Sequence, residues 1–173
     1  MAEPILTTER LVFRPFAADD FGLLARLHQD AQVGRYFGGV WSDAQVAETL
    51  ARFVAEQAAR GHSKWAVFTR DGAFAGRAGV SFWPPTGELE LGYALLPAFW
   101  GGGLATEAAR AVAAWTFANT AATHLIGFTD LANRGSQRVL EKIGMVRQPD
   151  TDLGKGLSAV YRLDRPLTEK RLK

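Results

Sequence analysis

The residues with the clearest chemical potential form a glycine-rich junction between a predicted strand and a predicted helix. Gly101, Gly102 and Gly103 stand just before Ala105 and Thr106. Glycine lets backbone amides approach a ligand without hindrance from a Cβ, and the first N–H groups of a helix are unpaired and carry partial positive charge. The junction therefore predicts a site for a phosphate or pyrophosphate. The alternative is a strand-to-helix turn that binds nothing.

Two familiar phosphate-binding loops are excluded by their spacing. A dinucleotide-binding fingerprint needs a further glycine where Thr106 stands. A Walker loop needs Gly-Lys followed by Ser or Thr, whereas the pair Gly154-Lys155 is followed by Gly156. The glycine-rich junction is therefore of a third kind.

Two carboxylates precede the junction in a strand predicted over residues 88–95. Glu88 and Glu90 alternate with apolar residues, which include Leu89 and Leu91. Successive strand residues point to opposite faces, so both glutamates point away from the apolar side. A carboxylate in this place can act as a general base. A solvated strand face is the alternative interpretation.

A capped helix is predicted downstream over residues 133–142. Asn133 is a suitable N-cap and Gly144 a suitable residue just past the end. Ser136 lies in the first turn, where a hydroxyl either serves a ligand or satisfies backbone N–H groups of its own helix.

Three segments in this order resemble the GNAT superfamily of acetyl-CoA-dependent N-acetyltransferases. They are Glu88-Leu89-Glu90-Leu91-Gly92-Tyr93, Trp100-Gly101-Gly102-Gly103-Leu104-Ala105-Thr106-Glu107-Ala108, and the Asn133-x-x-Ser136 helix that ends Glu141-Lys142-Ile143-Gly144-Met145. The closest branch is the RimJ/RimL type, which includes ribosomal-protein N-terminal acetyltransferases. The resemblance extends from Thr8 to about Leu163. It implies one domain over residues 1–173, with a core at about 8–165.

The resemblance implies an α+β fold with a mixed, mostly antiparallel central sheet flanked by helices. Acetyl-CoA is expected in a cleft between two central strands, with its pantetheine arm against Leu95. In this family the loop often carries Gln or Arg where Trp100 stands, and Lys or Arg where Gly102 stands, so nearby arginines would supply the missing charge. The residues expected to bind acetyl-CoA are Leu95, Gly101, Gly102, Gly103, Ala105, Thr106, Asn133 and Arg138.

The implied reaction is direct attack of a neutral amine on the thioester carbonyl. Glu90 is the candidate base, acting directly or through water, although Glu88 remains an alternative. Many family members use a tyrosine to assist the departing sulfur, but Leu140 stands at that position here. Ser136 is therefore the candidate hydrogen-bond donor to the sulfur.

Composition limits the other classes of function. At 173 residues, the chain suits a single globular domain. Its net charge of +2 is too balanced to indicate nucleic-acid binding. It has no cysteine, and its three histidines lack metal-ligand spacing. No membrane-length apolar run occurs, so we expect a cytoplasmic protein without metal or membrane partners, as a monomer or homodimer.

Further elements follow from capping and alternation patterns. Ser42 and Gln45 form a capping-box pattern that opens a helix ending at Gly61. A shorter helix is expected after Asp20. A hairpin turns at Asp71-Gly72, and a longer helix follows the glycine loop. Strands are predicted over residues 11–14, 64–69, 74–82, 88–95, 124–129, 145–146 and 159–163, with helices over 42–60, 104–119 and 133–142.

The acceptor amine is not specified by the sequence. An α-amine of a protein or peptide is the leading expectation. A small-molecule amine, such as an antibiotic, a polyamine or an amino acid, is the alternative substrate. A non-catalytic acyl-CoA-binding module is the alternative from another class of function.

Overall fold

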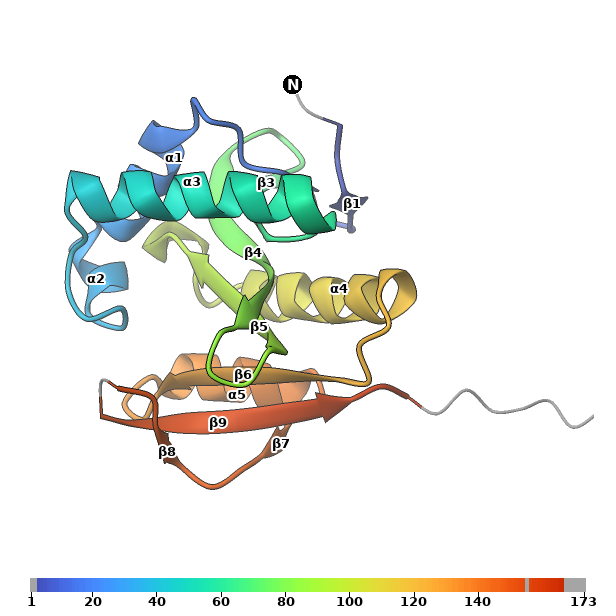
Figure 1. Ribbon diagram of the computed structural model, residues 1–173. Coiled ribbons are helices and arrows are strands. Elements are labelled where there is room, and N and C mark those ends of the chain that lie inside the picture. Colours follow the sequence, from blue (N-terminus) through green and yellow to red (C-terminus); the bar gives the residue numbers. More distant parts are fainter. Residues whose placement is uncertain (1–2, 155, 167–173) are drawn as a thin grey trace, which may run out of the picture.

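The computed structural model describes residues 3–154 and 156–166, which form one mixed sheet with helices on both faces (Figure 1). The helices are α1 (Phe21–His28), α2 (Ala31–Gly34), α3 (Asp43–Arg60), α4 (Leu104–Asn119) and α5 (Arg134–Lys142), with a 3-10 turn η1 (Pro97–Phe99). The strands are β1 (Leu6–Thr7), β2 (Leu11–Arg14), β3 (Lys64–Thr69), β4 (Phe74–Trp83), β5 (Glu88–Leu95), β6 (His124–Asp130), β7 (Val146–Arg147), β8 (Thr151–Asp152) and β9 (Leu157–Asp164).

The sheet has the strand order β1-β2-β3-β4-β5-β6-β9-β7, with β8 beside β9. Within the described residues, β5 and β6 form the single parallel pair, and every other pair is antiparallel. A parallel connection needs a crossover, which α4 supplies. The predicted mixed, mostly antiparallel sheet is confirmed.

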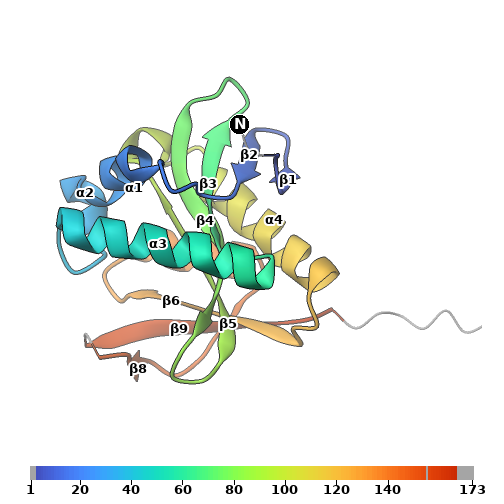
Figure 2. The same cartoon turned by 45° about the horizontal axis from the view of Figure 1, so that its top comes forward.

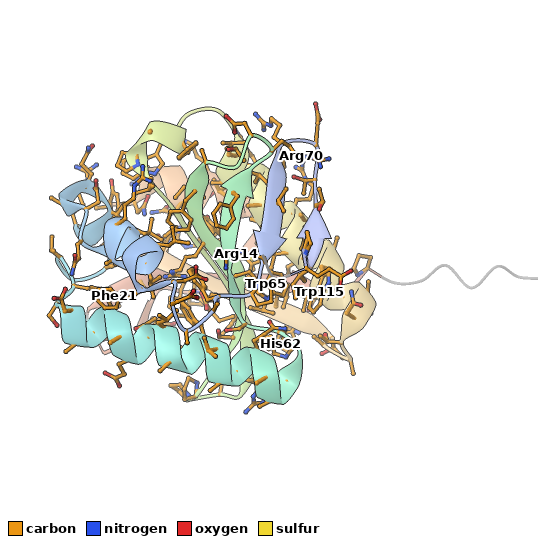
Figure 3. The ribbon with its side chains drawn as sticks, turned by 90° about the horizontal axis from the view of Figure 1, so that it is seen from above. Arg14, Phe21, His62, Trp65, Arg70 and Trp115 are labelled. Carbon is orange, nitrogen blue, oxygen red and sulfur yellow. The ribbon has the colours of Figure 1, made fainter. Side chains whose placement is uncertain are left out.

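One face of the sheet packs against α4 and α5, and α4 can be followed behind the sheet in Figure 2. Trp65 of β3 meets Trp115 of α4 edge to face, with ring centroids 4.8 Å apart (Figure 3). From β5 this face receives Leu89, Leu91 and Leu95, all buried. The odd-numbered residues of β5 therefore belong to the α4 and α5 side.

The opposite face packs against α1 and α3, with α3 in front of the sheet in Figure 2. Leu24 and Phe53 of these helices are buried against Ala66 of β3 and Ala94 of β5. The even-numbered residues of β5, which include Glu90, therefore face α1 and α3.

Most boundaries agree with the sequence predictions because local chemistry determines them. The Ser42 hydroxyl accepts from the Gln45 N–H at 3.3 Å, and the Gln45 side chain accepts from the Ser42 N–H at 2.9 Å, which confirms the capping box. Gly61 ends α3 with a left-handed φ of 75°. Asn133 is confirmed as the N-cap of α5, and Gly144 follows that helix with φ 92°.

The differences are confined to strand ends and very short elements. Strand β4 extends to Trp83 and β6 to Asp130, one residue past each prediction. Strand β7 begins at Val146, because the Met145 N–H donates to the Leu140 carbonyl of α5 at 3.1 Å and the pairing with β9 starts one residue later. β1, α2 and β8 were not predicted, because two to four residues are too few to show a hydrophobic period.

Candidate active site

A gap opens in the centre of the sheet where β5 and β6 separate. The two strands pair at one position, where Glu90 lies opposite Ile126. Strand β5 continues for five residues beyond it and stays paired with β4, with Ala94 opposite Arg77 and Leu95 opposite Gly76. On its β6 side, β5 therefore presents backbone past Glu90 without a continuous strand partner. This is where the cleft expected between two central strands would lie, and the cleft itself stays a prediction.

The glycine loop lies at the end of β5 and turns the chain into α4. Gly101 and Gly103 both have φ of 79°, a conformation that favours glycine. A Cβ built on Gly101 or Gly102 meets no atom within 4 Å, so the loop presents open backbone. Gly103 is the N-cap of α4 and makes no side-chain cap bond, which leaves the first helix amides free to bind an anion.

Arg10, which lies between β1 and β2, contacts this loop, and the sequence did not single it out. Its Nη1 donates to the Gly102 carbonyl at 2.8 Å, and its Nε pairs with Glu107 Oε2 at 2.6 Å. In a trans peptide the C=O and the following N–H point in opposite directions. Because Arg10 holds the Gly102 carbonyl, it directs the Gly103 N–H away from itself. Arg10 thus orients an amide of the loop that is predicted to bind phosphate.

Glu107 is held firmly although it lies in the first turn of α4. Its carboxylate accepts from the Thr8 hydroxyl at 2.6 Å and from the Arg10 backbone N–H at 2.9 Å. Burial acts to raise the pKa of Glu107, but the hydrogen bonds from Thr8 and Arg10 outweigh it and keep the pKa below its usual value. Arg10 therefore neutralises the negative charge of Glu107 beside the glycine loop.

Trp100 connects the glycine loop to the end of β5. Its indole Nε1 donates to the Leu95 carbonyl at 2.7 Å, while 41% of its surface is exposed. The next amide, Leu96 N–H, donates to Ala75 on β4 at 2.8 Å. Backbone groups alternate in direction along a strand, so the Leu95 N–H and C=O face away from β4. This orientation suits the predicted pairing of Leu95 with the pantetheine arm, which stays a prediction.

Glu90 forms a buried ion pair with Lys64. Lys64 Nζ donates to Glu90 Oε2 at 2.5 Å, to the Glu90 carbonyl at 2.8 Å and to the Gly79 carbonyl at 3.3 Å. Burial is the main cause of a lowered pKa for Lys64, against which Glu90 acts in the opposite direction. A Cβ on residue 92 would lie only 2.7 Å from Glu90 Oε1 and 2.9 Å from Lys64 Nζ. Gly92 thus makes room for the pair.

Glu88 has a different environment from Glu90. Its Oε1 lies 2.7 Å from His124 Nε2, and its side chain is 30% exposed against 16% for Glu90. It stands at the first residue of β5, two residues before the position where β5 and β6 pair. Glu90 instead folds over Gly92, where it meets Lys64 of β3. Which of the two glutamates is the base stays a prediction.

Ser136 is bonded to a tyrosine of β5. The Tyr93 hydroxyl lies 2.9 Å from Ser136 Oγ and donates to the Ser136 carbonyl at 3.1 Å. Asn133 accepts from the Ser136 N–H at 3.0 Å, so its side chain serves as the helix cap. Burial is the main cause of the raised pKa of Tyr93, which keeps its hydroxyl protonated. The sequence did not single out Tyr93, whose period-2 position resembles that of a core residue.

The two candidate catalytic groups lie on opposite faces of β5. Glu90 faces α3, since its strand neighbour Ser81 donates to Glu56 of that helix at 2.9 Å. Tyr93 faces α5 through Ser136. A group placed between β5 and β6 would therefore have a carboxylate on one side and a hydroxyl pair on the other.

Arg138 and Leu140 do not lie with the other candidate site residues between β5 and β6. Arg138 is exposed on α5, and no hydrogen bond or ion pair joins it to another described residue. Its predicted contact with the phosphates stays a prediction. Leu140 is 1% exposed and packs in the core, which agrees with the absence of a donor at that position.

The described part of the chain contains neither a candidate metal site nor a membrane-spanning helix. No group of three His, Asp or Glu side chains there is arranged to hold a metal ion. None of the helices in the same residues combines the length and the apolar character that crossing a bilayer requires.

Comparisons with known proteins identify the family. Residues 10–146 match the acetyltransferase (GNAT) domain. YkkB of Bacillus subtilis is 32% identical over 150 residues, which cover 83% of this chain and 86% of that protein. The crystal structure of an acetyltransferase from Agrobacterium tumefaciens superposes with a TM-score of 0.83 at 27% identity, covering 95% of this chain and 96% of that one.

More distant structures share the fold. RimL, a ribosomal L7/L12 alpha-N-protein acetyltransferase in complex with coenzyme A, has a TM-score of 0.74 at 16% identity, with 94% and 98% of the two chains covered. The aminoglycoside acetyltransferase AAC(6')-Ib in complex with coenzyme A has a TM-score of 0.76 at 18% identity, with 90% and 95% covered. The family match spans most of the chain, and this protein belongs to the GNAT acetyltransferases.

Proposed function

We propose that this enzyme transfers the acetyl group of acetyl-CoA to a primary amine by direct attack on the thioester. The observation that carries the proposal is the placement of Glu90 and Ser136 on opposite faces of β5, beside the gap between β5 and β6. An amine approaching from the α3 side meets the carboxylate. The sulfur leaving on the α5 side meets the hydroxyl pair. Binding in this geometry supplies the proximity and orientation that the reaction needs.

The phosphates of acetyl-CoA are assigned to the glycine loop and the start of α4. The amides of residues 101–106 are exposed or half-buried there, and the helix has no side-chain cap. Leu95 would pair with the pantetheine arm through the backbone groups that face away from β4. Asn133 and Arg138 complete the proposed set from α5. The open backbone at Gly101 and Gly102 is consistent with a loop that a ligand can approach closely.

The acceptor that suits this base best is an α-amine of a peptide or protein, as in the RimJ/RimL branch. Deprotonating an α-amine of pKa about 7.8 at pH 7 costs about 1.1 kcal/mol, against about 4.6 kcal/mol for a lysine amine of pKa about 10.4. Glu90 Oε2 already accepts from Lys64, which leaves Oε1 for the proton of the amine. A carboxylate that already pairs with Lys64 is better suited to an α-amine, because an α-amine costs less free energy to deprotonate.

The hydroxyl pair assists the leaving group only modestly. A thiol of pKa about 8.5 is a good leaving group, so one hydrogen bond to the developing thiolate suffices. Because the Tyr93 hydroxyl donates to the Ser136 carbonyl, Ser136 Oγ is the donor in its contact with the Tyr93 oxygen, and its hydrogen would turn from Tyr93 to the sulfur during the reaction. We assign Ser136 as the donor to sulfur and Tyr93 as the residue that positions it.

A small-molecule amine is the second acceptor class. The likeness to RimL and to an aminoglycoside acetyltransferase favours neither class, since both are under 20% identical to this chain. The non-catalytic alternative predicts acetyl-CoA binding without thiol release.

An acceptor screen tests the proposal. Purified protein is mixed with acetyl-CoA and N-terminal peptides, amino acids, polyamines or aminoglycosides, and thiol release and product mass are recorded. We expect product mass to increase by one acetyl group on an amine, with peptide α-amines fastest. Calorimetric binding of acetyl-CoA with no thiol release for any amine would instead support the non-catalytic module.

A further inference from the structure

Arg77 is a buried cation without a carboxylate of its own. It lies on β4 and is 7% exposed, and its pKa is lowered to about 10, mainly by burial. It therefore remains charged at neutral pH. Within the described residues it forms no ion pair, and its hydrogen bond goes from Nε to His28 Nε2 at 2.9 Å. A buried charge without a partner is costly, and proteins normally provide one.

The nearby charges do not neutralise Arg77. Glu90 is the carboxylate whose field acts on it, but that carboxylate is paired with Lys64. Arg52 of α3 adds a second positive charge that opposes the charged form of Arg77. A second carboxylate, Glu56, also acts on Lys64 and accepts hydrogen bonds from Ser63 and Ser81. Neither Glu90 nor Glu56 forms an ion pair with Arg77, which leaves its guanidinium able to bind an anion.

The guanidinium is held in a built site rather than a flexible surface position. Its Cζ lies 5.4 Å from the centroid of the Phe37 ring and 5.8 Å from that of Phe53. His28 stacks on Trp41 with ring centroids 3.7 Å apart, which fixes the imidazole that accepts from Arg77. Removing anionic oxygens from water strengthens their attraction to such a guanidinium.

Two donors of Arg77 remain available. Its Nη1 and Nη2 bond to no described residue. Among the described residues, two side-chain nitrogens are buried from solvent and have no hydrogen-bond partner: Nδ1 of His28 and Nδ1 of His62. The Nη atoms of Arg77 also have no partner but are not among these buried atoms, so they are in contact with solvent. A pocket of about 390 Å³ adjoins the same rings, lined by Phe37, Trp41, Glu48 and Arg52 among others.

We propose that Arg77 binds a carboxylate carried by the acceptor amine. The inference rests on the proposed function, since it places the acceptor on the α1 and α3 side, where Glu90 lies. Arg77 is opposite Ala94, two residues along β5 from Gly92, over which the Glu90 carboxylate folds. Two residues of strand span about 6.6 Å. The planar fork of Nη donors matches the two oxygens of a carboxylate. The acceptor class is therefore an amine with a carboxylate several bonds away, such as an acidic N-terminal peptide or an ω-amino acid.

Paired acceptors test this inference directly. Each amine acetylated in the screen is compared with a form that differs in one carboxylate replaced by its amide, using peptides and a series of ω-amino acids of increasing length. We expect the acid to exceed the amide by about tenfold to a hundredfold in kcat/KM, the range for a hydrogen bond to a charged group.

The variant Arg77→Met should abolish that preference while leaving the melting temperature unchanged or higher, because replacing a buried unpaired charge with an apolar side chain is often stabilising. Arg60→Met, at the far end of α3 over Phe82, is the matched control and should keep the preference. Equal rates for acids and amides, or an Arg77→Met variant that melts earlier and loses all acceptors equally, would overturn the inference. If no amine were acetylated, the result would count against the proposed function instead.

Discussion

At the scale of single residues, the ion pair of Glu90 and Lys64 constrains how the base can be tested. Both side chains are largely buried, and Lys64 uses all three donors on the Glu90 carboxylate, the Glu90 carbonyl and the Gly79 carbonyl. Removing one partner leaves a buried charge uncompensated, at a cost of about 3–5 kcal/mol. A loss of activity in a single variant could therefore reflect unfolding rather than lost basicity.

We expect Glu90→Gln to lower turnover by about 10²–10⁴-fold, the usual range for a general base, with acetyl-CoA affinity near wild type. The double variant Lys64→Met/Glu90→Gln removes both charges and should restore the melting temperature but not the turnover. Steady-state kinetics, calorimetry and thermal melting on both variants separate the two effects. Glu88→Gln is the control, and a larger loss in that variant would transfer the role to Glu88.

The hydroxyl pair of Tyr93 and Ser136 is tested through the leaving group. We expect Tyr93→Phe and Ser136→Ala each to lower kcat with acetyl-CoA by about tenfold to a hundredfold. The double variant should be little worse than either single one, because both act through one hydrogen bond to sulfur. With S-phenyl thioacetate, whose aryl thiol is more acidic, the deficits should shrink.

A different pattern would assign these residues to structure. If Ser136 only stabilised α5, Ser136→Ala would lower the melting temperature, by the equivalent of about 1 kcal/mol, and leave turnover intact with both donors. The contact of Ser136 Oγ with Tyr93 rather than with the backbone of α5 argues for the catalytic assignment.

At the scale of elements, the backbone of the glycine loop before α4 is oriented by a residue from the turn between β1 and β2. Arg10 follows β1 and reaches across to Gly102 and Glu107. We expect Arg10→Leu to weaken acetyl-CoA binding about tenfold, since one phosphate-binding amide loses its fixed orientation, while kcat at saturation stays near wild type. Calorimetric titration and steady-state kinetics measure the two quantities.

Arg162→Leu is a matched control for that variant. Arg162 pairs with Asp164 at 2.8 Å and is 41% exposed, close to the 47% of Arg10. Exposed pairs contribute little stability, about 0–1 kcal/mol, so both variants should fold. Unchanged affinity in Arg10→Leu, or an equal decrease in Arg162→Leu, would contradict a specific role for Arg10.

Local signals were sufficient to predict the elements that frame the site. The alternation of β5, the capping box at Ser42 and the glycines before α4 each depend on neighbouring residues, and the structure has each of them where the sequence placed it. The same holds for Asn133, which caps α5. The short strands β1 and β8 could not be predicted, because they exist only through pairing with β2 and β9.

The partners of the site residues could not be predicted from the sequence. Lys64 is 26 positions from Glu90, and Tyr93 is 43 from Ser136. Their contacts depend on strand register and on the face to which each side chain points. Read along the chain, Lys64 begins a strand and Tyr93 continues an apolar alternation, so neither shows a chemical role. Arg77 is hidden in the same way, on a strand with small neighbours.

At the scale of the whole molecule, two histidines are buried in different places: His28 lies on the α1 and α3 side of the sheet, and His62 lies beside Phe82 of β4. His28 is fully buried, and burial together with the positive charge of Arg77 lowers its pKa to about 2. Burial also lowers the pKa of His62. An unfolded histidine has a pKa of about 6.5. On acidification, the two histidines are therefore protonated in the unfolded chain at a pH where they are still neutral in the folded chain.

The free energy of unfolding should therefore decrease as the pH falls from about 6.5, since stability decreases with falling pH wherever the unfolded state binds more protons. Each histidine contributes at most about 1.4 kcal/mol per pH unit. Carboxylates with lowered pKa values, such as Asp20 and Glu107, add to the loss only below about pH 4. Urea unfolding at pH 7, 6 and 5 measures the slope. In the double variant His28→Gln/His62→Gln the slope between pH 6.5 and 5 should largely disappear. The glutamine oxygen at position 28 can still accept from Arg77, so the variant removes titration and keeps the hydrogen bond. A slope that persists in this double variant would assign the acid sensitivity to other groups.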